Sequence, residues 1–175
     1  MSLSFIHDLL GEVRRDRLAP AGAWSALEQI IGVDLPSDYK EFVDGYGEAM
    51  LFDHLYVPHP MSSPSLAEFI ESENETLREV FEPDSDMPER VRESWNRMIP
   101  WAYHNWDGDT CVLLPPVEGD GWRVAVAFRQ YHRFKVFDGD FSDFLRGILK
   151  LGEFPPGWPT GGPLWRETED GPLVF

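Results

Sequence analysis

Apolar residues in the first part of the chain recur three and four positions apart, the spacing that places side chains on one face of a helix. Three such helices are expected. Their inward faces hold Ile6, Leu9, Leu10 and Val13 in the first, Trp24, Leu27, Ile30 and Ile31 in the second, and Tyr39, Phe42, Val43 and Tyr46 in the third. Gly32 and Gly47 suit the ends of the second and third helices, and Pro36 suits the first turn of the third.

A fourth helix is marked at its start by a capping box. Ser65 and Glu68 stand three positions apart, so each side chain can satisfy a free backbone N–H in the first turn. This helix is expected to run to about Phe81. After a loop at residues 82–88, a shorter helix is expected around Val91.

After Pro100 the chain consists of short apolar runs separated by glycine-containing turns, which is the pattern of strands. One or two strands are expected within 50–57, and others at 101–103, 110–114, 122–128 and 134–137. A last helix then carries Phe141, Phe144, Leu145, Ile148 and Leu149 and stops at Gly152. The order is therefore helices first and strands later.

The last 24 residues differ in composition from the rest. Residues 152–175 hold ten glycines and prolines, which cannot sustain a helix or a central strand. The same segment holds Phe154, Trp158, Trp165 and Phe175, and a purely disordered tail lacks such aromatic residues. We expect one domain over residues 1–151, with 152–175 extended and packed at least partly on it.

The chain is strongly acidic, with 31 Asp and Glu against 15 Lys and Arg and a net charge of −16. This balance argues against direct binding to nucleic acid or to an anionic membrane, because both reward Lys and Arg. It favours basic partners, although acidity also serves solubility alone. The start of the chain lacks the pattern of a signal peptide, and no stretch reaches the ~18 apolar residues of a membrane span. A cytoplasmic location is expected.

Residues able to carry chemistry are few. Cys111 is the only cysteine, which excludes an internal disulfide framework, and its apolar surroundings predict a small buried hydrophobe. His104, Asp107 and Asp109 could ligate a metal ion, but Asp-Gly-Asp is also ordinary turn chemistry. No phosphate-binding loop and no Gly-x-Ser-x-Gly elbow is present. We therefore expect no catalytic residue, no metal and no cofactor, with a metal-dependent hydrolase as the minor alternative.

Acidic residues concentrate between Glu68 and Glu93. This stretch holds ten acids and three arginines, a net −7 over 26 positions. Glu71, Glu75 and Glu79 lie four positions apart on the fourth helix, where like charges are mildly destabilising. The stretch is either a solvated helix face or a negative surface kept for a basic partner.

The run from residue 24 to 47 resembles the start of the SUKH superfamily, which includes fungal cell-wall regulators and bacterial immunity proteins. The matching elements, in order, are Trp24, Leu27, Glu28, Gly32, Leu35, Pro36, Tyr39, Phe42, Tyr46 and Gly47. Later elements such as Trp122 and Phe141-x-x-Phe144 extend the resemblance over residues 20–150. It implies an α+β fold, a mostly antiparallel twisted sheet packed against helices, which agrees with the order of elements above.

The resemblance also implies a function. The chain would be a non-enzymatic immunity protein that neutralises a toxin, such as a basic nuclease, of a bacterial polymorphic or contact-dependent system. The alternative is a regulatory or scaffold module unrelated to a toxin. The free chain is expected to be a monomer. The residues expected to bind the protein partner are Glu71, Glu75, Glu79, Glu82, Asp84, Asp86, Asp107, Asp109, Glu118 and Asp120.

Overall fold

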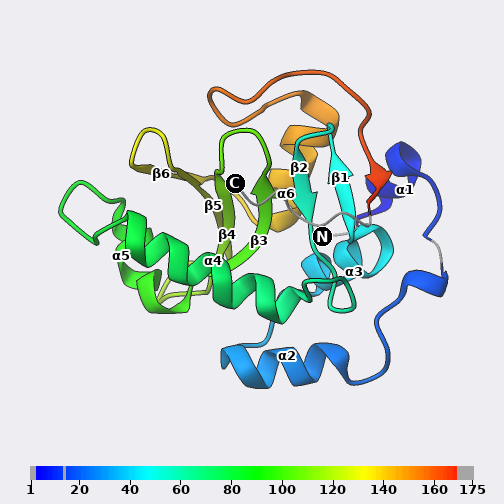
Figure 1. The fold of residues 1–175 in the computed structure, drawn as a ribbon, viewed down its shortest axis with the longest axis horizontal. Coiled ribbons are helices and arrows are strands. Elements are labelled where there is room, and N and C mark those ends of the chain that lie inside the picture. The colour runs from blue at the N-terminus through cyan, green and yellow to red at the C-terminus, as the bar shows by residue number, and fades with distance from the viewer. Residues whose placement is uncertain (1–2, 14, 169–175) are drawn as a thin grey trace.

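The computed structural model describes residues 3–13 and 15–168, and it has the expected α+β fold (Figure 1). Within these residues the strands form one sheet in the order β6-β5-β4-β3-β2-β1-β7, and every neighbouring pair is antiparallel. The strands are β1 (Ala49–Leu51), β2 (Leu55–Val57), β3 (Ile99–His104), β4 (Thr110–Leu114), β5 (Arg123–Phe128), β6 (Arg133–Phe137) and β7 (Arg166–Glu167). The mostly antiparallel sheet expected from the sequence is confirmed.

The helices occur close to where the apolar spacing and the capping residues predict them. The first helix is shorter than expected, because it ends at Leu10 before Gly11, so Val13 lies beyond it. They are α1 (Ser4–Leu10), α2 (Ala23–Ile31), α3 (Ser37–Tyr46), α4 (Leu66–Val80), α5 (Glu89–Ser94) and α6 (Phe141–Arg146). Short 3₁₀ turns, η1 (Arg15–Arg17) and η2 (Trp95–Arg97), follow α1 and α5, and α6 continues as a π-helical turn, η3 (Gly147–Leu151). The capping box at Ser65 and Glu68 is formed, with both reciprocal hydrogen bonds in place.

Helices cover both faces of the sheet, and β4 shows this residue by residue. Val112 and Leu114 pack in one apolar cluster with Leu77 of α4 and Val91 of α5. Cys111 and Leu113 belong to the other cluster, which includes Tyr39 of α3, Trp101 of β3 and Phe141 of α6. All four β4 side chains are fully buried. Cys111 is therefore a small buried hydrophobe, as expected.

The inward face of the second helix differs from the expectation. In α2 only Leu27 is buried, and Ile30 is 74 % exposed. Figure 1 shows α2 at the periphery of the molecule, below α3 and α4, so the rest of the fold covers only part of its apolar stripe. Helical spacing indicates which residues share a face, but how much of that face is covered depends on tertiary packing.

The described part of the C-terminal segment, residues 152–168, crosses one end of the sheet and reaches its far edge (Figure 1). We call it the strap. Trp158 is buried, and Nε1 of Trp165 donates to the carbonyl oxygen of Tyr46 at 2.9 Å. The strap ends in β7, which pairs with β1 and adds an edge strand that the sequence pattern did not predict. Phe175 lies outside the described residues.

Replacing Ser65 with alanine tests the start of α4. We expect Ser65→Ala to lower the free energy of unfolding by about 1 kcal/mol, because the N–H of Glu68 loses its side-chain acceptor. Ser72→Ala, at an exposed position within the same helix, is the matched control and should be neutral or slightly stabilising. Urea unfolding measures both values, and equal effects at the two serines would contradict the capping role.

Candidate functional site

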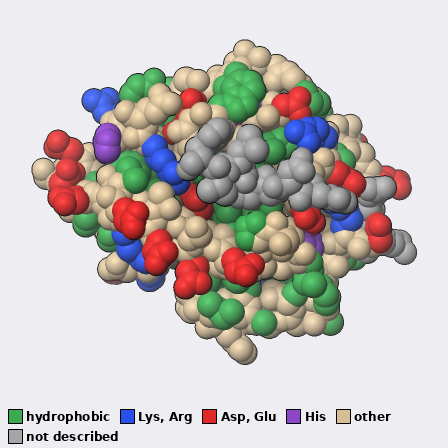
Figure 2. Space-filling view, viewed as in Figure 1, with side chains coloured by type: hydrophobic (Ala, Val, Ile, Leu, Met, Phe, Trp, Pro, Cys, Tyr) green, Lys and Arg blue, Asp and Glu red, His purple; other side chains and the backbone are tan. Residues whose placement is uncertain are grey.

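A row of acidic side chains runs over α4 and the loop that follows it (Figure 2). All six are exposed, and we call them the acidic ridge: Glu71, Glu75, Glu79, Glu82, Asp84 and Asp86. The ridge follows from the amphipathic pattern of α4, because burying Leu66, Phe69 and Leu77 turns the glutamates outward. The structure thus brings together six of the ten predicted partner-binding residues.

The charges of the ridge are left open to solvent. Within the described part of the chain, no hydrogen bond or ion pair engages the carboxylates of Glu71, Glu75, Glu79, Glu82 or Asp86. Asp84 is the exception, because its Oδ1 accepts from the backbone N–H groups of Asp86 and Met87 and holds the loop. Unpaired exposed carboxylates give this face a negative potential that acts over about a Debye length.

A groove lined partly by apolar side chains lies at each end of the ridge. One, of about 550 Å³, has Phe81, Met87 and Phe134 among its lining residues. Glu82 and Asp86 form an acidic part of its wall, and Arg133 lines it beside Phe134. Lys and Arg side chains combine an aliphatic stem with a charged end, so apolar and acidic lining residues side by side suit them.

The other groove, of about 490 Å³, lies between α2, α4 and η2. Ile30 and Ile70 line it together with Glu71 and Glu75, and Arg78 and Arg97 complete its wall. Ile30 is thus a residue of the candidate site that sequence reasoning assigned to the core. No local pattern in the sequence marked it, because the exposure of Ile30 depends on how α2 packs on the rest of the fold.

Glu118 and Asp120 lie away from the ridge, in the turn between β4 and β5. Glu118 is exposed. Asp120 is engaged within the chain: hydrogen bonds from Arg123 and then from Arg90 lower its pKa to about 2. Its charge is therefore balanced by two guanidinium groups and is not free for a partner.

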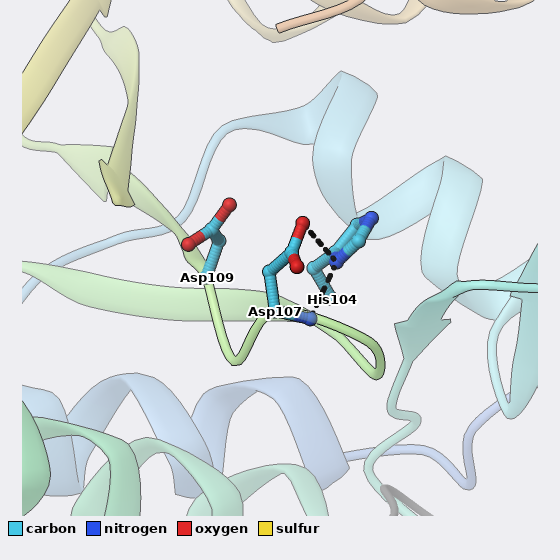
Figure 3. A group of neighbouring side chains, drawn as sticks. All are labelled: His104, Asp107 and Asp109. Atoms are coloured by element: carbon cyan, nitrogen blue, oxygen red, sulfur yellow. Dashed lines mark hydrogen bonds and ion pairs between the residues drawn. The ribbon is translucent and has the colours of Figure 1, made fainter. Parts of the chain in front are cut away.

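Asp107 and Asp109 lie in the turn between β3 and β4, close to His104 (Figure 3). Asp107 is half-buried, and its Oδ1 accepts from the side-chain amide of Gln130 at 3.2 Å. Asp109 is only 3 % exposed and accepts from Nε1 of Trp158 at 2.9 Å and from the backbone N–H of Arg129 at 3.1 Å. The expectation that Asp109 faces a partner is thus corrected, because the strap covers it.

His104, Asp107 and Asp109 are the group most able to hold a metal ion, with one potential ligand atom from each residue within 4.8 Å of the others. Each of the three residues, however, already accepts at least one hydrogen bond. Nδ1 of His104 accepts from the backbone N–H of Asp107 at 3.1 Å, and an unprotonated imidazole nitrogen has one lone pair to give. Hydrogen bonds of these three residues therefore hold the turn, while Nε2 of His104 is buried without a hydrogen-bond partner among the described residues.

Two fully buried histidines lie beside this turn. The rings of His54 and His104 are 4.5 Å apart, and Trp158 stacks on His104 at 4.7 Å. Burial, together with repulsion from His54, lowers the pKa of His104 to about 3, and burial also lowers the pKa of His54. Both rings are therefore neutral at physiological pH and act as packing residues beneath the strap.

The chain matches no protein-family model, no curated protein and no solved structure. Among the described residues, no helix is long and apolar enough to cross a membrane. The function is therefore argued from the site itself.

The buried histidines predict acid sensitivity. The pKa of His104 is about 3 in the folded chain against an ordinary value of 6.5, so the unfolded chain takes up the proton first as the pH falls. Stability should be complete above pH 6.5 and decline towards pH 3, with a slope of up to about 1.4 kcal/mol per pH unit for each such histidine. Urea unfolding at several pH values measures this slope.

His104→Asn should flatten that slope, because asparagine does not titrate and keeps an acceptor for the N–H of Asp107. His132→Asn, at an exposed position with a φ of 49° that asparagine tolerates, is the matched control and should leave the slope unchanged. Equal slopes in wild type and His104→Asn would contradict the account.

The hydrogen bonds that His104, Asp107 and Asp109 already accept predict weak metal binding. We expect Zn²⁺ or Mn²⁺ to leave the unfolding temperature unchanged, since a ligand stabilises the folded state only by binding it. Elemental analysis of the purified chain and thermal unfolding with and without each metal test this. Stoichiometric metal, lost on replacing Asp107 by asparagine, would contradict it and favour the hydrolase alternative.

Proposed function

We propose that this chain is a non-enzymatic protein-binding domain whose acidic ridge binds a basic protein. We further propose that it is a SUKH-type immunity protein of the cytoplasm, and that the partner is a toxin domain such as a nuclease. The observation that carries the proposal is the ridge itself: six exposed carboxylates, five of them without partners in the described part of the chain, with a partly apolar groove at each end. The resemblance of residues 20–150 to SUKH proteins supports the choice of partner.

The two parts of the surface have different roles in binding. Unpaired carboxylates raise the rate of encounter with a basic surface, and this effect weakens as salt is added. The partly apolar grooves provide places where a few large side chains of the partner can be desolvated, and such anchors carry most of the affinity of an interface. A typical stable interface buries about 1,600 Å² in total, and a ridge that spans α4 and its following loop offers room for one.

The proposed mechanism of neutralisation is steric and electrostatic. A nuclease holds its substrate through Lys and Arg contacts to phosphates. When the acidic ridge pairs with those Lys and Arg side chains, the nucleic acid can no longer reach them. Inhibition of this kind requires no covalent bond to be made or broken. If the chain is instead a regulatory or scaffold module, the same ridge would bind a basic partner unrelated to a toxin, and the identity of the neighbouring gene separates the two.

Charge reversal on the ridge tests the proposal. The chain is co-expressed with the toxin-like product of the adjacent gene, and the association rate is measured by stopped flow at increasing salt. For wild type we expect a complex and a rate that falls with salt. For the triple variant Glu75→Lys, Glu79→Lys and Asp86→Lys we expect the rate at low salt to fall by a factor of ten or more.

The matched control reverses three exposed acids outside the ridge, Asp8, Glu12 and Asp34, and so changes the net charge by the same amount. It should retain most of the rate, because charge position matters more than total charge at short range. Equal losses in the two triple variants, a rate indifferent to salt, or no complex at all would each refute the ridge as the binding surface.

A further inference from the structure

The edge strand β6 carries a surface of the opposite sign to the ridge. Arg133 and Lys135 are exposed on it, and within the described residues no carboxylate lies within ion-pair distance of either. Lys135 rests over the ring of Phe137, 5.1 Å from its centroid. In a chain of net charge −16, this is a local basic site.

The outer side of β6 is also open for pairing. In the described part of the chain β6 pairs only with β5, through all five of its residues. The other edge of the sheet ends in β7, which is two residues long. Short edge strands resist further pairing. β6 has five residues and is therefore the edge better suited to pair with an added strand.

A groove accompanies this edge. A hollow of about 350 Å³ lies between β6 and the strap, where Phe128, Tyr131, Pro156 and Gly157 line it with the two basic residues. A second hollow of about 330 Å³ continues from Lys135 past Phe137 and Phe154, but Asp138, Asp143 and Glu153 also line it, so it does not suit carboxylates. Tyr131 is 65 % exposed. The apolar walls thus lie along the part of the strand from Arg133 to Lys135.

We infer that β6 is a docking edge for an extended acidic segment of a partner protein, which adds a strand to the sheet. Carboxylates of the segment would pair with Arg133 and Lys135, and an apolar side chain would enter the hollow beside Tyr131. Main-chain hydrogen bonds supply affinity in this mode, and alternate side chains supply specificity. The inference goes beyond the proposed function, because it concerns the open edge of the sheet and a partner segment of opposite charge, although Arg133 and Phe134 also line the 550 Å³ groove at the end of the ridge.

A second copy of this chain fits the edge less well. Lys135 is the middle residue of Arg133–Phe137, so antiparallel pairing of two β6 strands about their centre would place one Lys135 opposite the other. Like charges directly opposite each other are destabilising, and lysine on an edge strand is a common device against self-pairing. The same side chain attracts a strand that carries carboxylates.

The test begins with a displayed library of random heptapeptides selected on the full chain. We expect enriched peptides to alternate apolar residues with Asp or Glu. Their affinity, measured by fluorescence anisotropy, should fall at least tenfold for the double variant Arg133→Glu and Lys135→Glu. The matched control, Arg92→Glu with Lys150→Glu at exposed positions elsewhere, should bind as wild type does.

A second measurement leaves the protein unaltered. Methylation of alternate backbone nitrogens in the enriched peptide removes the donors that strand addition needs, so binding should be lost when the methylated face is the one that meets β6. Hydrogen exchange at β6 amides should slow in the complex with the unmethylated peptide. Enrichment of basic peptides only, indifference to charge reversal at positions 133 and 135, or indifference to methylation would overturn the inference without touching the ridge.

Discussion

Burial of one antiparallel sheet on both faces is the constraint on which the rest of the structure depends. Every residue of β4 is buried, and its side chains alternate between the cluster under α4 and α5 and the cluster over α3 and α6. A strand buried on both faces has no polar side to present to solvent. Most charged residues of this acidic chain therefore lie on the outer faces of helices, in turns and loops, and at the edges and strand ends of the sheet.

The strap fixes the side chains of the turn between β3 and β4, at one end of the sheet. Trp158 contacts His104 and hydrogen-bonds Asp109, a residue 49 positions earlier in the chain. A carboxylate that is buried needs donors, and the indole N–H together with the backbone N–H of Arg129 supplies them. His104, Asp107 and Asp109 resemble a metal-ligand cluster in the sequence, but in the structure their hydrogen bonds support a turn. The strap also places Pro156 and Gly157 beside β6, where they form one wall of the groove.

Local signals in the sequence predicted most of the elements, and long-range contacts explain the failures. The capping box at Ser65, the glycine at 152 and the limits of β4 depend on neighbouring residues, so they could be predicted from them. The exposure of Ile30 and the pairing of β7 depend on segments far away in the chain, so no local pattern carried them. For the site, the amphipathic spacing of α4 placed Glu71, Glu75 and Glu79 on an outer face. The burial of Asp109 and the pairing of Asp120 required the strap and Arg90, which only the fold brings near.

The net negative charge alone identifies no partner, but the arrangement of the carboxylates favours one class of partner. The ridge offers unpaired carboxylates beside partly apolar grooves, which is the combination that a basic protein surface can use. The most direct test of this central claim is a hydrogen-exchange map of the chain with and without its basic partner. The account predicts that protection on binding concentrates in α4 and the loop at residues 81–88, with α3 and α6 unchanged. Protection confined to elements away from α4 and that loop would contradict it.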